Sequence, residues 1–228
     1  MSSWDDKVAI ITGGSAGLGL ALARHWSAAG ARVVIVARQE AALQEVARTL
    51  SAPGHPVHAM AADVTQQHDV DHLFARVRDQ FGRLDVLVNC AGRSDRGQAA
   101  ETSPAAFETL WQLNFLATVR CAQAAIPLLS RTSGHLVNVG SLASKIAGPY
   151  LGAYPASKFA VAAFCHQLRL EISPDDVHVL LVCPGPIARE DSGQRYADKA
   201  SNLPPSARKP GGGAKLKGIA ADRLAQLI

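Results

Sequence analysis

Three residues between positions 141 and 158 have the types and spacing for acid–base chemistry. Tyr154 and Lys158 stand four residues apart in an alanine-rich run that predicts a helix, so their side chains fall on one face. Pro155 indicates that this helix has only just begun, because proline is tolerated in a first turn but not deeper. A fixed ammonium favours the phenolate of a nearby tyrosine and lowers its pKa, ordinarily about 10, by roughly 1–3.

Ser141 follows an apolar run, residues 135–140, where a strand is expected to stop. A hydroxyl at that point can hydrogen-bond a substrate oxygen beside the tyrosine. Together the three residues indicate proton transfer to or from an oxygen while something else moves a hydride. A Tyr-x-x-x-Lys pair also arises by chance on exposed helices, so this interpretation requires a nucleotide site in the same chain.

A glycine-rich segment near the N-terminus provides that site. Gly13, Gly17 and Gly19 lie between a predicted strand, residues 7–12, and a predicted helix, residues 20–30. Without side chains the backbone can approach a pyrophosphate, and the helix N-terminus supplies amide donors and the positive end of a dipole. An ordinary turn can carry the same glycines, but the strand before and the helix after them favour a nucleotide site.

The residue after the second predicted strand, residues 32–37, is Arg38. NAD binding usually uses an acidic residue at this point, and the nearest carboxylate, Glu40, is expected to begin the next helix. Arg38 offers a planar cation suited to a 2′-phosphate, with the hydroxyl of Ser15 nearby in the glycine loop. We therefore predict NADP(H) in preference to NAD(H). The alternative is a surface arginine that covers the sheet edge.

Strand-like and helix-like segments alternate along most of the chain. We expect strands at residues 7–12, 32–37, 56–60, 84–88, 135–139 and 177–183, and helices at residues 20–30, 39–50, 66–81, 104–129 and 151–172. This alternation predicts an α/β Rossmann fold, a single domain over residues 1–228 with a doubly wound parallel sheet in the order 3-2-1-4-5-6. Near-continuous apolar strands agree, since such a sheet is covered on both faces.

The last part of the chain has a different character. Residues 186–217 contain PGP, LPPSARKP and GGG without a stable period, which predicts a flexible lid over the substrate site; residues 218–228 then read as a helix. Residues 1–188 contain 15 basic and 15 acidic residues, whereas residues 189–228 contain 8 and 4, so the net charge of +4 lies in the last segment. A solvated loop explains this excess, and so does a basic rim that attracts an anionic substrate or a membrane surface.

Composition excludes several classes of protein. A chain of 228 residues, 48% hydrophobic and 18% charged, predicts a compact globular domain. No run approaches the roughly 18 consecutive apolar residues of a membrane span, and the N-terminus lacks a signal-peptide pattern, so we expect a cytoplasmic protein. The basic residues are not interleaved with stacking aromatics, which argues against nucleic acid. The cysteines are widely spaced and predict buried thiols rather than disulfides or a zinc site: Cys90, Cys121, Cys165 and Cys183.

Taken together, the motifs resemble those of the short-chain dehydrogenases/reductases (SDRs) over residues 7 to about 187. TGGSAGLG at positions 12–19 resembles the T-G-x-x-x-G-x-G loop of the family, and NCAG at positions 89–92 is similar to N-N-A-G, with Cys90 in place of the second asparagine. Asp63 and Val64 resemble the pair that holds the adenine ring. PGPI at positions 184–187 resembles the segment that flanks the nicotinamide. Further matches to the catalytic serine, the Y-x-x-x-K motif and a helix asparagine are Ser141, Tyr154, Lys158 and Asn114.

The resemblance implies a role for each residue. Tyr154 would exchange the proton with the substrate oxygen, and Lys158 would lower the pKa of Tyr154 and bind the nicotinamide ribose. Ser141 would polarise the carbonyl, and Asn114 would bind a water that links Lys158 to solvent. With no metal expected, the predicted cofactor site comprises Gly13, Ser15, Gly17, Leu18, Gly19, Arg38, Asp63, Val64, Asn89, Ala91, Gly92, Tyr154, Lys158, Pro184, Gly185 and Ile187.

The predicted function is NADP(H)-dependent hydride transfer to or from a carbonyl or alcohol carbon of a small or lipid-like substrate. A nucleotide-binding scaffold or sensor with little catalysis is the alternative. A nucleotide-sugar epimerase or dehydratase would carry G-x-x-G-x-x-G and a separate sugar-binding domain.

The resemblance also implies an assembly and a longer sheet. Helices at about 104–129 and 151–172 would pair across a two-fold axis to give a homodimer or homotetramer. Family members generally continue past the last helix with a further edge strand. Since the sequence given stops within that helix, we expect either a shortened chain or a protein that lacks this strand.

Overall fold

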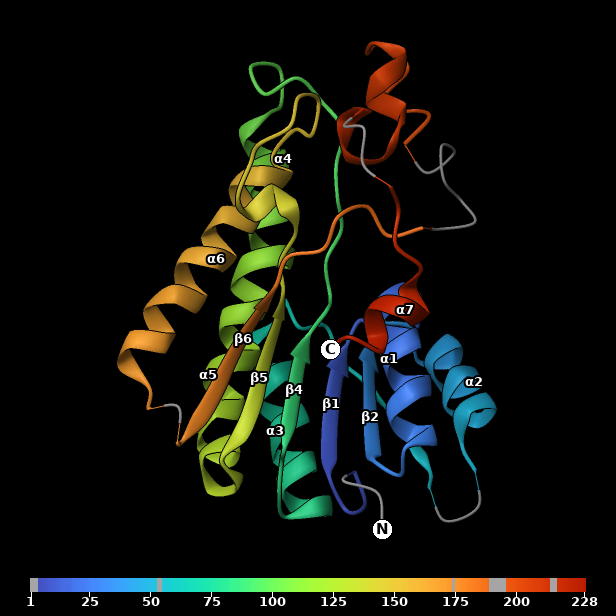
Figure 1. Ribbon diagram of the computed structural model, residues 1–228, viewed down its shortest axis with the longest axis vertical. Coiled ribbons are helices and arrows are strands. Elements are labelled where there is room, and N and C mark those ends of the chain that lie inside the picture. Colours follow the sequence, from blue (N-terminus) through green and yellow to red (C-terminus); the bar gives the residue numbers. More distant parts are fainter. Residues whose placement is uncertain (1–3, 53–54, 174, 189–195, 214–216) are drawn as a thin grey trace.

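One parallel sheet of six strands, in the order β3-β2-β1-β4-β5-β6, forms the centre of the computed structural model (Figure 1). The structure describes residues 4–52, 55–173, 175–188, 196–213 and 217–228. The strands are β1 (Val8–Thr12), β2 (Arg32–Ala37), β3 (Val57–Ala61), β4 (Val86–Asn89), β5 (Gly134–Val139) and β6 (Val177–Val182). The predicted fold class and strand order are confirmed.

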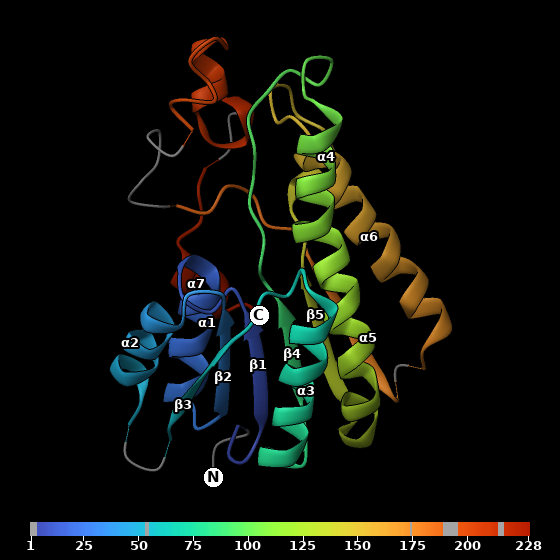
Figure 2. The same cartoon turned by 180° about the vertical axis from the view of Figure 1, so that it is seen from behind.

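Helices cover both faces of this sheet (Figures 1 and 2). One layer contains α1 (Gly17–Ala28), α2 (Glu40–Leu50) and α7 (Ala221–Ala225), and the other contains α3 (Gln67–Phe81), α5 (Ala117–Leu129) and α6 (Tyr154–Glu171). Successive residues of β1 supply the two cores alternately: Ile10 packs on the α3 side and Ile11 on the α1 side, both fully buried. This two-sided burial is why the strands are almost continuously apolar.

The helix predicted over residues 104–129 is interrupted. Ser103 caps α4 (Pro104–Trp111) by accepting a hydrogen bond from the amide of Ala106. A π-helical turn, Gln112–Leu116, then separates α4 from α5. Single π turns inside helices are frequent at functional sites, and this one carries Asn114, which is fully buried.

The same stretch of helix is also unusually apolar. Within the described residues, Pro104–Thr132 is long and apolar enough to cross a membrane by length and composition, and 44% of its most apolar window is buried. In the sequence this stretch is not one uninterrupted apolar run, because Glu108 and Arg120 lie within it. A core helix meets the same two criteria, and Cys121, Ala122 and Ala125 pack into the core on the α3 side.

Several other boundaries differ from the sequence prediction. α6 begins at Tyr154 rather than at residue 151, with Pro155 in its first turn. α1 begins three residues earlier than expected, within the glycine-rich motif. The last helix is shorter than predicted, because Ile219 instead forms a parallel bridge with Ile187.

The segment predicted as an unstructured lid, residues 186–217, contains regular turns in its described part. Two 3₁₀ turns, Pro205–Arg208 and Pro210–Gly213, follow one another there. Positions 189–195 and 214–216 of that prediction lie outside the described residues.

None of the four cysteines, which all lie in the described part of the chain, forms a disulfide, but the expectation that all are buried is wrong for two of them. Cys121 and Cys165 are buried, whereas Cys90 and Cys183 are half-buried. The last two follow the carboxyl ends of β4 and β6, where the helical layers no longer cover the chain.

Asp85, just before β4, organises the amino-terminal end of the sheet. Its carboxylate accepts hydrogen bonds from Arg83 (2.9 and 2.7 Å), from Lys7 Nζ (3.2 Å) and from the amide of Val8 (2.9 Å). Burial raises the pKa of Asp85, but these bonds and the arginine charge outweigh it and hold the pKa below its usual value. The buried carboxylate is therefore fully compensated by neighbouring groups.

Candidate active site

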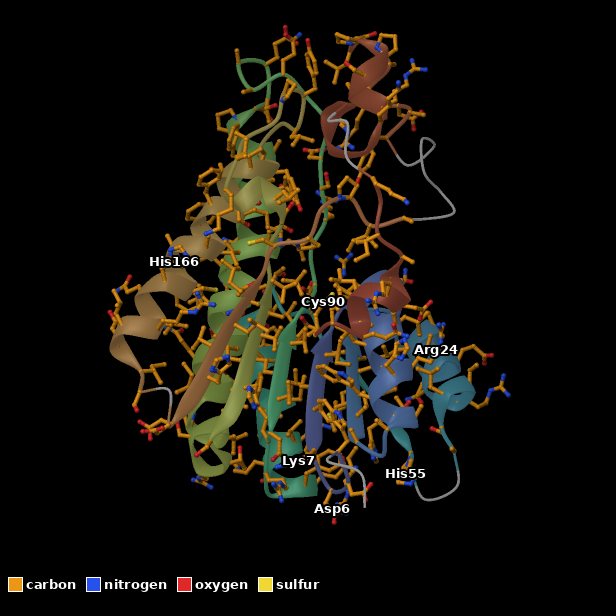
Figure 3. All side chains as sticks on the ribbon, viewed as in Figure 1. Asp6, Lys7, Arg24, His55, Cys90 and His166 are labelled. Carbon is orange, nitrogen blue, oxygen red and sulfur yellow. The ribbon has the colours of Figure 1, made fainter. Side chains whose placement is uncertain are left out.

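A cavity of about 850 Å³ opens above the carboxyl ends of the strands. It lies where the strand order reverses between β1 and β4, the place where open parallel sheets bind ligands. Cys90, labelled in Figure 3, marks this point at the end of β4. Most of the predicted site residues line the cavity: Gly13, Ser15, Gly17, Leu18, Arg38, Asp63, Val64, Ala91, Gly92, Ser141, Tyr154, Lys158, Pro184, Gly185 and Ile187.

Three predicted residues, Gly19, Asn89 and Asn114, lie behind the lining and support it. A side chain on Gly19 would collide with the carbonyl oxygen of Gly13, so the glycine permits close packing of α1 against the loop. The side chain of Asn89 is buried and donates to Asn138 Oδ1 (2.9 Å). Both residues hold the walls of the site together.

The glycine loop leaves amide groups available to a ligand. Gly13 and Gly17 have φ values of 69° and 56°, which favour glycine. The amides of Gly13 and Gly14 donate to the carbonyl of Val36 and fix the turn against β2. The N-cap of α1, Ala16, has no side-chain acceptor, so the first amides of α1 have no side-chain cap. Such an uncapped helix N-terminus binds anions.

Arg38 and Asp63 line the cavity at the ends of β2 and β3. Arg38 is exposed, and Glu40 begins α2 as predicted. The carboxylate of Asp63 accepts hydrogen bonds from the amide (3.0 Å) and hydroxyl (2.7 Å) of Thr65. Burial raises the pKa of Asp63, but these bonds and the charge of Arg38 outweigh it and lower the pKa. Asp63 is therefore ionised and fixed in orientation at neutral pH.

The turn after β5 fixes Ser141. Its Oγ accepts a hydrogen bond from the amide of Ala143 (3.1 Å), and Ser144 Oγ accepts one from the amide of Ser141 (3.1 Å). This reciprocal capping box orients the hydroxyl. No acceptor for the Ser141 hydroxyl proton occurs among the described residues, so it can donate to a ligand in the cavity.

Lys158 reaches the same cavity from the second turn of α6. Its side chain is buried, and Nζ donates to the carbonyl of Val139 at the end of β5 (2.7 Å). Burial lowers the pKa of Lys158 to about 8, against the small opposing effect of nearby cysteines. An ammonium has three donors, and the described residues provide no acceptor for the other two besides Tyr154, so these two can serve a ligand or Tyr154.

Asn114 connects the loop after β4 to α6. Its Oδ1 accepts from the amide of Arg93 (2.9 Å), and its Nδ2 donates to the carbonyl of Arg93 (2.9 Å) and to Ser157 Oγ (3.0 Å). A Cβ atom on Gly92 would lie 3.0 Å from Asn114 Oδ1 and 3.7 Å from Lys158 Nζ. The amide side chain thus positions the wall beside Lys158, and the predicted water relay stays a prediction.

Thr12 links the two central loops, a role that sequence reasoning missed. Its Oγ1 accepts hydrogen bonds from the amides of Cys90 (3.0 Å) and Ala91 (3.1 Å) and donates to the carbonyl of Val88 (3.3 Å). The position of Thr12 as the first residue of the glycine-rich motif was the available signal.

Sequence reasoning also missed several other residues that line the cavity. The lining includes three arginines and a tyrosine outside the motifs, as well as apolar side chains: Arg93, Arg96, Arg208, Tyr196, Leu113, Leu142, Ile146 and Leu151. The basic excess after residue 188 was a signal for Arg208. A metal would need other ligands, since no group of three or more His, Cys, Asp or Glu side chains gathers in the part of the chain that the structure describes.

Comparisons with known proteins agree with this geometry. The family model for short chain dehydrogenase matches residues 7–200. An uncharacterised oxidoreductase of Staphylococcus epidermidis is 32% identical over 209 residues, 89% of this chain and 90% of that protein. Dehydrogenase/reductase SDR family member 7B of Bos taurus is 36% identical over 187 residues, which are 79% of this chain but only 58% of that longer protein.

A solved structure extends the likeness to three dimensions. L-Sorbose reductase from Gluconobacter frateurii, complexed with NADPH and L-sorbose, gives a TM-score of 0.84 at 28% identity, over 98% of this chain and 88% of that one. From its sequence motifs through its topology to its relatives, the chain belongs to the short-chain dehydrogenase/reductase family of oxidoreductases.

Proposed function

We propose that the protein is an NADP(H)-dependent oxidoreductase that interconverts a carbonyl compound and its alcohol, with Tyr154 as general acid and base. The observation that carries this proposal is the buried ammonium of Lys158, which shares one cavity with Tyr154, Ser141 and the glycine loop. A buried cation without a carboxylate partner stabilises whichever anion forms beside it. The phenolate of Tyr154 is that anion.

The proton transfer follows from these positions. With a pKa of about 8, Lys158 is mostly protonated at neutral pH, and its charge favours the ionised form of Tyr154. The hydroxyl of Ser141 donates a hydrogen bond to the substrate oxygen and polarises it. Tyr154 gives its proton to that oxygen during reduction and takes it back during oxidation. A bound nicotinamide cofactor supplies or accepts the hydride.

The cavity walls fit such a cofactor. The uncapped amides of α1 suit a pyrophosphate, and the free donors of Lys158 suit ribose hydroxyls. Arg38 and Ser15 on the lining suit a 2′-phosphate. The related L-sorbose reductase, whose structure holds NADPH, supports the choice of NADP(H).

Replacing Tyr154 by phenylalanine tests the chemistry. Tyr154→Phe keeps the ring but removes the proton, so turnover of a carbonyl panel with NADPH should fall by roughly 10²–10⁴-fold, while NADPH binding by fluorescence stays near wild type. Tyr150→Phe, at a tyrosine outside the cavity lining, should keep full turnover. If wild type binds NADPH and reduces no carbonyl, the protein is a nucleotide-binding scaffold instead.

Replacing Arg38 tests the cofactor preference. Arg38→Gln should lower the ratio of kcat/KM for NADPH over NADH by on the order of tenfold, or about 1.4 kcal/mol. Arg48→Gln on α2, an exposed arginine that pairs with Glu45, should leave the ratio unchanged. A wild-type preference for NADH would contradict the proposed role of Arg38.

The same family membership supports a proposed dimer or tetramer. The outer surface of α4 and α6 exposes large apolar side chains, with Trp111 41% and Phe159 43% accessible. Pairing of these helices across a two-fold axis would bury them. Light scattering after gel filtration should show a dimer or tetramer, and Trp111→Glu should yield the monomer.

A further inference from the structure

Positively charged side chains line the part of the cavity that contains Arg96. Three arginines line it, Arg93, Arg96 and Arg208, in addition to Arg38. The one carboxylate among the described lining residues is Asp63, which lies at the end of β3 beside Arg38. The described lining near Tyr154 therefore carries arginines and no carboxylate.

A cofactor phosphate at Arg38 does not account for these three arginines. Arg38 follows β2, whereas Arg93 and Arg96 follow β4, and β1 lies between the two strands. At roughly 4.8 Å per strand spacing, the two groups start about 10 Å apart. Arg96 lies nearer to Tyr154: burial lowers the pKa of Arg96, and the charges of Tyr196, Asp95 and Tyr154 partly oppose this effect.

Arg96 is a buried cation that forms no ion pair with a carboxylate in the described part of the chain. It is 6% exposed, and its guanidinium donates to the carbonyls of Ala207 (2.6 Å), Asp95 (2.6 Å) and Lys209 (3.3 Å), and to Ser94 Oγ (3.0 Å). The Asp95 carboxylate is paired with Lys199 Nζ at 2.6 Å. Within the described residues no carboxylate lies within ion-pair distance of Arg96.

The groups around Arg96 leave its positive charge in place. Its guanidinium lies 4.0 Å from the centre of the Tyr196 ring, a cation–π contact that leaves the charge in place. A guanidinium has five N–H groups, and four of them donate in the hydrogen bonds above. Backbone carbonyls and an aromatic face satisfy most of the hydrogen-bond donors of Arg96 and cover its guanidinium, but they carry no negative charge that would neutralise it.

The bonds of Arg96 also place two further guanidinium groups. By holding the carbonyls of Ala207 and Lys209, Arg96 ties the turn that carries Arg208 to the loop that carries Arg93. Both views of the ribbon show this part of the chain beside the loop after β4 (Figures 1 and 2). The side chains of Arg93 and Arg208 are exposed and make no ion pair or hydrogen bond within the described residues.

We infer that the substrate carries an anionic group, a carboxylate or a phosphate, which Arg93 and Arg208 bind in the positive field of Arg96. The apolar side chains of Leu142, Ile146 and Leu151 on the lining suit an apolar body between this group and the reacting carbonyl. This inference rests on the proposed carbonyl chemistry at Tyr154 and names the substrate class for it. Guanidinium groups bind carboxylates and phosphates in a bidentate manner.

Three aromatic aldehydes of similar size test the inference. They are 4-carboxybenzaldehyde, its neutral methyl ester and 4-formylphenyl phosphate, assayed as reduction by NADPH. Both anionic aldehydes should exceed the ester in kcat/KM by roughly tenfold or more at low salt, mostly through KM, and the advantage should shrink as salt screens the charges. The ratio between the two anions tells carboxylate from phosphate. Equal kcat/KM for all three aldehydes at every salt concentration would overturn the inference.

Substitutions at the two free arginines connect the preference to the structure. Arg93→Gln and Arg208→Gln should each reduce kcat/KM for the anionic aldehydes by roughly five- to tenfold and leave the ester within twofold. Arg131→Gln, an exposed arginine just after α5, should change neither substrate. A loss that is equal for acid and ester would show that these arginines only shape the fold.

A binding measurement separates this inference from the proposed function. The aldehydes are titrated calorimetrically into protein saturated with whichever oxidised nicotinamide cofactor binds more tightly, a complex in which reduction cannot occur. Tighter binding of the acid than of the ester, lost in Arg208→Gln, supports the anion site even if no aldehyde is reduced. Equal binding of acid and ester overturns it even if both are reduced.

Discussion

Buried charges at the two ends of the sheet are treated in opposite ways. At the amino-terminal end, the carboxylate of Asp85 is surrounded by Arg83, Lys7 and the amide of Val8. At the carboxyl end, Lys158 and Arg96 are equally buried, but their described partners are backbone carbonyls, a hydroxyl and an aromatic ring. A charge that is neutralised within the fold stabilises the fold, whereas one left unneutralised is held for a ligand.

The largest expected effect is on turnover at the carboxyl end. Lys158→Met removes the charge that favours the Tyr154 phenolate, so kcat should fall by roughly 10²–10⁴-fold, measured by NADPH consumption. Lys145→Met, at an exposed lysine whose Nζ is 3.5 Å from His166, should keep wild-type kcat. If Lys158→Met kept its activity, the contrast between the two ends would lose its functional meaning.

Lys158 should also show the pH dependence of an uncompensated cation. Its pKa is about 8 in the folded chain against the ordinary 10.5, so between these values the unfolded chain binds the proton and the folded chain does not. Wild type should therefore gain stability relative to Lys158→Met as pH rises from 7 to 10, by about 3 kcal/mol. Urea unfolding of both proteins without cofactor measures this, and a constant difference across that range would contradict it.

At the amino-terminal end the expected effect is on stability alone. Asp85→Asn leaves Arg83 and Lys7 facing an amide, so the free energy of unfolding at pH 7 should fall by about 3 kcal/mol, with kcat unchanged in the folded fraction. Asp79 pairs with Arg78 on the surface, and Asp79→Asn should lower the free energy of unfolding by less than about 0.5 kcal/mol. A loss no larger than that of Asp79→Asn would show that the network is not a stabilising one.

The acid limb should show the same sign of pH dependence as Lys158, because there too the unfolded chain binds more protons than the folded chain. The pKa of Asp85 is lowered in the folded chain, so its contribution is present above the unfolded pKa of about 4 and is lost as pH falls through the lower folded value. The difference in urea stability between wild type and Asp85→Asn should thus shrink below about pH 4. A difference that grows in acid would mean that the carboxylate is destabilised in the fold.

The smallest effect belongs to an ion pair outside both ends. Arg24 and Asp222 join α1 to α7 at 2.9 Å, but their side chains are 52% and 56% exposed. Arg24→Gln should change the free energy of unfolding by less than about 1 kcal/mol, as measured by urea denaturation. A larger loss would show that burial does not decide which charges matter here.

The sequence was sufficient for the sheet and for the residues next to strand ends. Apolar runs identify the strands because both faces are covered, and parallel strands bring residues after their ends, such as Arg38 and Ser141, to one edge. The partners of a side chain were not predictable in this way. Ser144, which completes the cap of Ser141, and Ser157, which bonds Asn114, stand in no recognised pattern.

Two further features depend on tertiary contacts, which the local pattern of apolar and polar residues does not reveal. The π turn at Gln112–Leu116 has ordinary helix-forming residues, so the pattern predicted an unbroken helix. The hydrogen bonds of Arg96 to Ala207 and Lys209 join residues that are separated by 111 and 113 positions in the chain. In sequence, Arg96 is one arginine among several in a polar loop, and only the fold distinguishes it.

The parallel bridge between Ile187 and Ile219 has a consequence for how this scaffold can diversify. After β6 ends at Val182, the bridge brings the backbones of Ile187 and Ile219 side by side, so the segment between them starts and ends at one place. Lengthening or exchanging a segment closed in this way costs little additional loop-closure entropy and leaves the register of the strands unchanged. New specificities can therefore be grafted between these two isoleucines without rebuilding the proton-transfer machinery.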